Sequence, residues 1–333
     1  MLFEYNKKAQ QYKNQFCDKY KNISYNKYIY IKMMNKNYEQ NSAKVTQYGG
    51  HMVMTNVVPP TKTKYLTIDT RFRDEYNFGS VANYNISLPE RINDVKSMRV
   101  KNMEIPITFY NISENMGNNV FTISILNKRV TIILPDGQYN EQVLVSIINN
   151  EITTMTSPFT SIIFKIENHR CIFSNEGSKN DCVLNFDVYK NVNATNNYMT
   201  TLGWLMGYRK SKYVLYPNSR IEGETFLCLT GPRYLYLIVD EFKNGNPHSF
   251  LSLSRTSELS SQQILARISL DPTDYPFGTI LLAYDYGNCC SDTRTYSNEI
   301  NIQRMNVRLV DEFGTIMNLN GMDFSFCLEL THL

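Results

Sequence analysis

The chain has 333 residues, of which 42% are hydrophobic and 20% charged, so it can bury a substantial core in one large domain or two smaller ones. Its net charge of +3 is uneven, because residues 1–60 hold nine Lys against three acidic residues, a balance of +6 that leaves −3 for the remainder. Met1 is followed by a polar stretch rather than a signal peptide, and no apolar run approaches the roughly 20 residues of a membrane-spanning helix. We therefore expect a soluble, intracellularly made chain with a basic N-terminal arm.

Residues 1–60 are rich in Lys, Asn, Tyr and Gln, and their apolar residues are too scattered to build a core. This composition predicts an extended or disordered arm. Tyr interleaved with Lys suits stacking on single-stranded nucleic acid, and it suits packing along a neighbouring subunit equally well. The candidate arm contacts are Lys7, Lys8, Lys13, Lys19, Lys21 and Lys27.

From Tyr65 onward most of the sequence has strand periodicity. Apolar residues alternate with polar ones at Leu66 and Ile68, and again at Tyr84, Ile86 and Leu88, where we expect the strand to stop at Pro89. The next run changes register by one residue, which predicts a β-bulge; its apolar positions are Met98, Val100, Met103 and Ile105.

Turn signals and a change of period mark the middle of the chain. Asn127-Lys128 and Asn168-His169 predict two hairpins, and helical spacing after Asn140, a candidate N-cap, predicts a helix that ends near Ile152. Met199–Gly207, which holds the single tryptophan Trp204, predicts a short second helix.

Strands return in the C-terminal part, where the last one alternates cleanly. The expected strands are 226–229, 234–239, 264–270, 279–284, 300–309 and 324–330. Since the first and last strands are both strongly apolar on one face, we expect them to pair or lie next to each other. About fourteen strands with few helices favour an all-β antiparallel β-sandwich with one or two short helices.

No residue pattern indicates an enzyme. The four His, at positions 51, 169, 248 and 332, are scattered, and there is no GxSxG, HExxH or Gly-rich phosphate loop. We therefore predict no catalytic residues, no cofactor and no metal site.

The seven Cys predict buried thiols in a reducing compartment, because they are odd in number, lack a CxxC pair and mostly lie in apolar segments. Cys289-Cys290 is an exception in a polar loop. We expect weakly exposed thiols there, with an inter-subunit disulfide as the alternative.

A charged cluster, Asp69, Arg71, Arg73 and Asp74, follows the first strand. If the strand continues, Arg71 and Arg73 lie on one face with Phe72 on the other, and the two Asp neutralise them. Two interpretations stay open: a strand-end cluster of salt bridges, each worth little, or an inter-subunit contact.

Several strings resemble a group of jelly-roll penton and minor capsid proteins of nucleocytoplasmic large DNA viruses. They are Leu66–Asp74 (LTIDTRFRD), Tyr84–Pro89 (YNISLP), Val95–Pro106 (VKSMRVKNMEIP), Asn118–Phe121 (NNVF), Leu134–Tyr139 (LPDGQY), Asn306–Gly314 (NVRLVDEFG) and Asp323–Leu330 (DFSFCLEL). The resemblance covers about 65–333 in outline, is weak between 153 and 263, and leaves out the arm.

This resemblance implies a jelly-roll domain at 61–333, and the number of expected strands favours one jelly roll with an inserted subdomain at about 135–215 over two full jelly rolls. The resemblance also implies a non-enzymatic component of an icosahedral capsid, made in the viral factory of the host cytoplasm. Its partners would be copies of itself, as a homo-oligomer within the shell, and the major capsid protein. The arm lies outside the resemblance, and we expect it to reach across a subunit boundary or toward the inner membrane or nucleic acid.

Two other functions remain open at this stage. One is a carbohydrate- or receptor-binding β-sandwich that uses the tyrosines Tyr284, Tyr286 and Tyr296. The other is a nucleic-acid-binding internal virion protein that uses the basic arm.

Overall fold

The structure is a computed structural model that describes residues 60–74, 80–155, 157–188, 197–242, 263–285 and 287–333. The chain separates into two units, Met1–Pro59 and Pro60–Leu333, and every described residue belongs to the second. The predicted arm, with its six candidate Lys, lies outside the described residues apart from Pro60.

The described part consists mostly of antiparallel strands. In chain order the elements are β1 Lys62–Asp69, η1 Thr70–Phe72, β2 Asn83–Pro106, β3 Val120–Ile125, β4 Lys128–Ile133, α2 Glu141–Thr153, η2 Phe159–Ser161, β5 Ile162–Glu167, β6 Arg170–Asn175, β7 Cys182–Asn185, η3 Tyr198–Thr200, α3 Leu202–Leu205, β8 Lys212–Leu215, β9 Arg220–Glu222, β10 Tyr234–Asp240, β11 Ile264–Ser269, β12 Ile280–Tyr284, β13 Cys289–Ser291, β14 Arg294–Asp311 and β15 Ser325–His332. This confirms the predicted fold class: within the described ranges the chain forms an antiparallel all-β fold with two short α-helices.

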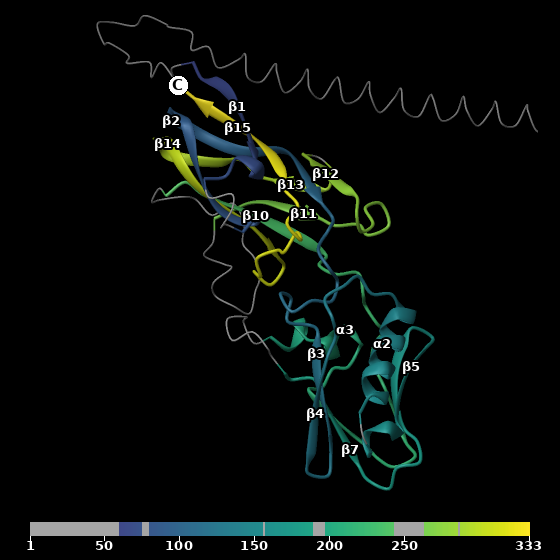
Figure 1. The fold of residues 1–333 in the computed structure, drawn as a ribbon. Coiled ribbons are helices and arrows are strands. Elements are labelled where there is room, and N and C mark those ends of the chain that lie inside the picture. Colours follow the sequence, from purple (N-terminus) through teal and green to yellow (C-terminus); the bar gives the residue numbers. More distant parts are fainter. Residues whose placement is uncertain (1–59, 75–79, 156, 189–196, 243–262, 286) are drawn as a thin grey trace, which may run out of the picture. The chain divides into compact units, whose positions relative to one another are not determined.

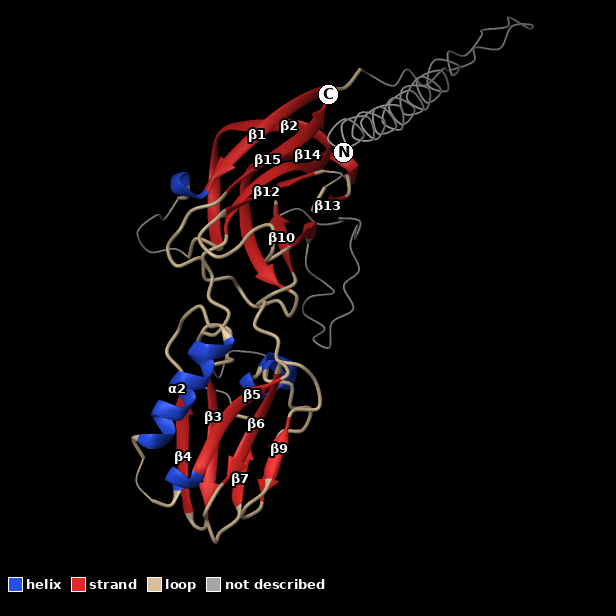
Figure 2. Cartoon of the chain, turned by 90° about the vertical axis from the view of Figure 1, so that its right-hand side faces the viewer, coloured by secondary structure: helices blue, strands red, loops and turns tan. Residues whose placement is uncertain are grey.

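The largest sheet brings the two ends of the described chain together. Its strand order is β1-β15-β2-β14-β10-β11-β13, and β12 pairs with β2 as a further strand. β1 and β15 lie side by side along their whole length, with Leu66 opposite Leu328 and Ile68 opposite Phe326 (Figure 1). The predicted pairing of the first and last strands is therefore confirmed, and the sheet curls around the core that its inward residues form (Figure 2).

β2 holds this sheet together, because it pairs with β14, β15 and β12 in turn. The predicted bulge is confirmed: Cys327 lies opposite Asn102 and Leu328 opposite Val100, so Lys101 is the extra residue. The expected strand end at Pro89 is wrong. Pairing with β14 is irregular from Ser87 to Ile92, so the missing N–H of Pro89 interrupts no regular ladder there.

A second core gathers residues from Ile112 to Leu215. Its strands form two sheets, β4-β3-β7-β8 and β5-β6-β9, and α2 packs beside them (Figure 2). Asn149 of α2 fixes the helix to β5, because its side chain accepts from Phe164 N at 2.9 Å and donates to Phe164 O at 2.8 Å. The predicted subdomain at 135–215 stays a prediction, which this core would extend toward residue 112.

Local signals in this region are confirmed. Asn140 caps α2 by accepting from Val143 N at 2.9 Å, and the hairpins β3–β4 and β5–β6 form at the predicted turns. The expected short helix is α3, where Leu202 is buried and Trp204 half-buried.

The strand expected at 226–229 is wrong. Isolated bonds hold this segment, from Leu227 N to His169 O and from Cys228 N to Leu205 O, in place of a ladder.

Candidate functional site: the surface at the end of β1

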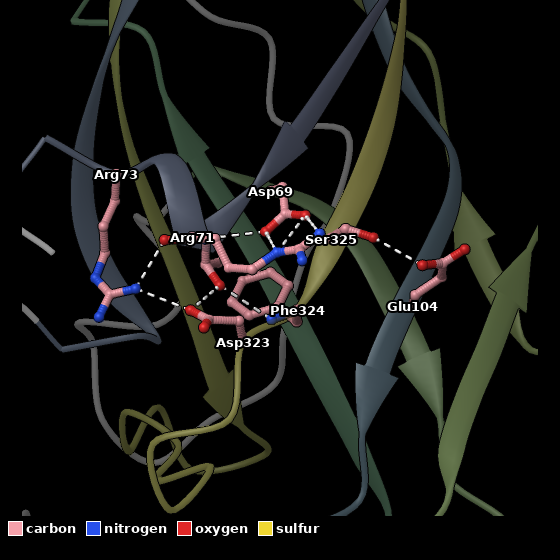
Figure 3. Close-up of polar contacts among 8 residues, drawn as sticks. Asp69, Arg71, Arg73, Glu104, Asp323, Phe324 and Ser325 are labelled. Atoms are coloured by element: carbon pink, nitrogen blue, oxygen red, sulfur yellow. Dashed lines mark hydrogen bonds and ion pairs between the residues drawn. The ribbon is translucent and has the colours of Figure 1, made fainter.

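β1 ends at Asp69 because the side chain of this residue caps the short helix η1. The Asp69 carboxylate accepts from Arg71 N at 2.9 Å and from Arg71 Nε at 3.0 Å (Figure 3). The hydrogen bond from the Arg71 guanidinium is the main reason that the pKa of Asp69 lies below its ordinary value. The Arg71 side chain is 66% exposed, so this ion pair lies at the surface.

Arg73 has a different environment, because it is buried and binds the turn before β15. Its Nη1 donates to Thr70 O at 2.7 Å and to Asp323 Oδ1 at 2.9 Å (Figure 3). The Thr70 hydroxyl donates to Asp323 Oδ1 at 2.7 Å and accepts from Phe324 N at 3.0 Å. This network joins residues 250 positions apart in the sequence, and its role is to hold the fold.

The Asp74 side chain binds β2. Its carboxylate accepts from Ser87 N at 3.0 Å and from the Ser87 hydroxyl at 2.7 Å, which ties it to β2. The charged cluster therefore divides into an exposed pair, a buried network and a bond to β2.

The prediction that Arg71 and Arg73 share one strand face is wrong. η1 replaces the expected strand, because the Asp69 side chain accepts from the backbone N–H of Arg71 in the helical turn. The turn exposes Arg71 and buries Arg73. Of the four candidates, Arg71 and Asp74 are exposed, Asp69 is half-buried and Arg73 is buried. The Asp69–Arg71 pair therefore brings a guanidinium and a carboxylate together at the surface.

Asp69 and Arg71 line a hollow of about 310 Å³ on the outer face of the large sheet. Across the strands, Asp69 lies opposite Ser325 of β15, Ser325 opposite Glu104 of β2, and Glu104 opposite Leu282 of β12. The Ser325 hydroxyl donates to Glu104 Oε2 at 3.1 Å (Figure 3). The hollow therefore combines carboxylates with apolar side chains.

The apolar residues that line the hollow are Pro106, Ile280, Met322 and Phe324, and Ile280 is the first of three outward-facing residues of β12. Ile280, Leu282 and Tyr284 are 60%, 51% and 58% exposed, while Leu281 and Ala283 between them are buried. An exposed apolar stripe on a sheet is typical of an interaction surface rather than of a chemical site. We call these residues, with Asp69, Arg71 and Glu104, the β12 face.

The sequence patterns singled out Tyr284 of β12 but missed Glu104, Asp323, Ile280 and Leu282. Glu104 had a signal, because it is a charged residue between the apolar positions Met103 and Ile105 and so has to face outward. Asp323 had none, since its contact with Arg73 spans most of the chain.

The other candidate groups are placed as follows. Cys289-Cys290 lies in β13 rather than in a loop, so alternation buries Cys289 and exposes Cys290, which corrects the expectation of two exposed thiols. Burial raises the pKa of the Cys289 thiol to about 11. Of the three tyrosines proposed for sugar stacking, Tyr284 is exposed, Tyr296 is half-buried and packs against the core of the large sheet, and Tyr286 lies outside the described residues.

Among the described residues, no group of three or more His, Cys, Asp or Glu is arranged to hold a metal ion. Within the same residues, no helix has the length and apolar character needed to cross a membrane.

Comparison with solved structures gives similarities at low identity, and two of them follow. One is the penton protein of mavirus, with a TM-score of 0.43 and 9% identity over 81% of this chain and 99% of that chain. The other is a chain of the Sputnik virophage, with a TM-score of 0.40 and 13% identity over 82% of this chain and 98% of that chain. No protein-family description and no curated protein matches the sequence. Since both TM-scores lie below 0.5, neither similarity decides the family or the function.

Proposed function

We propose that this protein is a structural component of the icosahedral capsid of a large DNA virus, either the penton subunit or a minor capsid protein. It acts by assembly and not by catalysis, and it resides in the virion after synthesis in the host cytoplasm. Its partners are further copies of the chain and the major capsid protein. Its parts are the arm at 1–60 and a jelly-roll domain at 61–333 that carries the subdomain at 135–215.

One observation carries this proposal. Five of the seven strings that resemble penton and minor capsid proteins come from the two ends of the domain, and they lie in or directly beside the contiguous strands β1, β15, β2 and β14. Strands that are adjacent in space constrain each other's sequence, so a resemblance at both ends supports a shared sheet rather than two chance matches.

The β12 face supports assembly as the mode of action. A stable interface has an apolar centre, and polar groups around it fix the orientation of the two partners. Obligate interfaces bury about 2,000 Å² or more in total. The stripe on β12 supplies an apolar centre, and the Asp69–Arg71 pair and Glu104 supply the polar edge. Arg71 is thus the proposed inter-subunit contact, whereas Arg73 and Asp74 act inside the subunit.

Cryo-electron microscopy of the purified virion tests the proposal. We expect density for this chain within the shell, at the vertices for a penton or beneath the major capsid lattice for a minor protein. A shell map that accounts for every subunit without this chain would contradict it.

Incorporation of variants tests the contact. Arg71→Ala should lower the amount of this chain per particle, whereas Arg91→Ala, a change at another exposed arginine, should not. Equal incorporation of both variants would exclude Arg71 as a contact but leave the capsid role standing.

The two alternatives have distinct results. A nucleic-acid-binding protein would show DNA binding that weakens steeply with salt and disappears when residues 1–60 are deleted. A receptor-binding protein would be retained on a glycan array.

A further inference from the structure

β12 is an edge strand in the described part of the chain, where β2 is its only strand partner. Ile107 N, directly after β2, donates to Thr279 O, directly before β12, at 2.8 Å, so the odd-numbered residues bond toward β2. Because antiparallel strands alternate the direction of their backbone groups, the N–H groups of Ile280, Leu282 and Tyr284 point away from β2. A further strand can therefore bond to this edge.

The edge lacks the features that protect edge strands from pairing. Charged residues and proline usually block such an edge, and β1, the outer strand on the other side of the sheet, carries Lys62 and Lys64. β12 has the sequence Ile-Leu-Leu-Ala-Tyr, with no charge and no proline. The residues that direct their N–H groups outward also expose apolar side chains, so an added strand gains both hydrogen bonds and apolar contacts.

The charges beside this edge are negative. Residues 271–285 contain three Asp and no Lys or Arg. Asp285 forms an ion pair with Arg99 at 3.5 Å. Asp274 and Glu104 are exposed, and the ion pairs among the described residues include neither of them. A basic strand is thus favoured at this edge, whereas a second copy of the edge would bring like charges together.

Glu104 fixes where the positive charge has to lie. It is opposite Leu282 across β2 and β12, so the residue of an added strand that lies opposite Leu282 is two strand spacings, about 10 Å, from Glu104 on the same face. A Lys or Arg side chain can span this distance together with the Glu104 side chain, with its apolar stem on Leu282.

Glu104 has the capacity to accept such a group. The Ser325 hydroxyl donates to Glu104 Oε2 at 3.1 Å (Figure 3). A carboxylate has about four acceptor sites on its two oxygens, so one hydrogen bond leaves room for an ammonium or guanidinium group.

We propose that β12 binds an extended segment of another chain of the shell as a further strand of the large sheet. The bound segment has a Lys or Arg opposite Leu282 and apolar residues opposite Ile280 and Tyr284. Its basic group binds Glu104, and its apolar side chains cover the two ends of the exposed stripe. This inference rests on the proposed function, because it names the kind of segment that the β12 face binds during assembly.

A blocked synthetic peptide, Thr-Val-Thr-Lys-Thr-Val-Thr, presents this pattern, and the matched control peptide has Glu in place of Lys. Titrated into the full-length protein to about 1 mM and followed by fluorescence anisotropy, the Lys peptide should bind at least about tenfold more tightly than the Glu peptide. Hydrogen exchange should slow at the N–H groups of Leu282 and Tyr284 when the Lys peptide is bound. Absence of binding, equal affinities for the two peptides, or protection confined to other segments would overturn the proposal.

Two variants separate the side-chain contact from the strand edge. Glu104→Gln should bring the affinities for the two peptides within about twofold of each other, because it removes the charge that distinguishes them. Leu282→Pro removes an outward N–H but spares the bonds to β2, so it should weaken both peptides, with thermal unfolding as the check that the variant is folded. A tenfold preference that persists in Glu104→Gln contradicts the assigned contact.

Analytical ultracentrifugation of the protein without peptide identifies the competing occupant. Dimers that Leu282→Pro abolishes would show that a second copy, and not a basic segment, occupies the edge. A monomer supports the proposal. A peptide that fails to bind would leave the capsid role standing, whereas a shell map without this chain would contradict the capsid role and leave the peptide affinities unchanged.

Discussion

Two ion pairs of the large sheet, Arg294–Glu241 and Arg71–Asp69, use the same chemistry in opposite environments. The Arg294 and Glu241 side chains are 2% and 0% exposed, and Arg294 Nη1 donates to Glu241 Oε2 at 2.8 Å. Arg294 also donates to Val239 O at 2.8 Å and to Gln263 O at 2.9 Å, so it joins the end of β10 to the residue before β11. The buried pair is committed to the fold, whereas the exposed pair is accessible to a partner.

The buried pair should give the largest loss of stability. Arg294→Met leaves Glu241 in the interior without this guanidinium, and breaking a buried pair costs about 3 to 5 kcal/mol. Urea unfolding of the purified protein measures this loss in the free energy of unfolding. Arg91→Met, at an exposed position, should change stability by less than about 0.5 kcal/mol.

The double variant Arg294→Met/Glu241→Gln sharpens this result. If it is more stable than Arg294→Met alone, the buried charge of Glu241 without the Arg294 guanidinium is the cause of the loss. If it is no more stable, the lost bonds to Val239 O and Gln263 O account for the effect instead.

Asp311 is a third carboxylate of the large sheet, and it is buried and bound by backbone N–H groups. It accepts from Phe313 N at 2.9 Å and from Thr315 N at 2.8 Å, yet desolvation by burial raises its pKa to about 7. Since the folded state then binds its proton more tightly than the unfolded state, this group stabilises the fold at pH 4 and loses that contribution as the pH rises to 7.

The slope from one such group is at most about 1.4 kcal/mol per pH unit. Asp311→Asn should flatten the fall in unfolding free energy between pH 4 and 7, as measured by urea titrations across that range. An unchanged pH profile would show that the N–H groups keep the carboxylate ionised.

Arg73 should lie between the two ion pairs in its effect. Arg73→Met removes the bonds to Thr70 O and Asp323 while keeping much of the side-chain volume, and charge-assisted hydrogen bonds contribute about 1.5 to 3 kcal/mol. Thermal unfolding measures the loss. Arg308→Met is a useful control, because Arg308 is a half-buried arginine of the same sheet. Equal losses for the two variants would deny Arg73 a special role in joining η1 to β15.

Arg71 should matter least for stability. Arg71→Ala breaks an exposed ion pair, which is worth about 0 to 1 kcal/mol. Because Arg71 lowers the pKa of Asp69, the small contribution of the pair is present above the unfolded pKa of Asp and is lost as the pH falls. Unfolding at pH 7 and at pH 3 checks both statements. A loss as large as that of Arg73→Met would mean that this pair also holds the fold.

Sequence reasoning found the features that local patterns determine. Alternation located β1, β2 and β15, a change of register located the bulge at Lys101, and the cap at Asn140 located the start of α2. Each of these depends on residues close together in the sequence, so the pattern carries the information.

The misses depend on contacts between distant residues. Arg73 is buried because it binds Asp323, and β2 continues through Pro89 because its pairing with β14 is irregular there. The exposed face of β12 is a third case: Leu281 and Leu282 are equally apolar, and only the pairing with β2 decides which one faces solvent. The sequence patterns therefore predicted which segments hold the candidate site residues, but not which of their side chains face solvent.

The adjacency of β1 and β15 also sets an order of events during synthesis. β1 leaves the ribosome early, but its partner begins at Ser325, and at 5 to 20 residues per second the delay is roughly ten seconds to a minute. The second core, from Ile112 to Leu215, is complete before that time. Because the hollow beside Asp69 needs Asp323 and Ser325, a nascent chain has no finished β12 face. Association through this face therefore has to wait until Asp323 and Ser325 have been synthesised, which separates the synthesis of β1 from assembly in time.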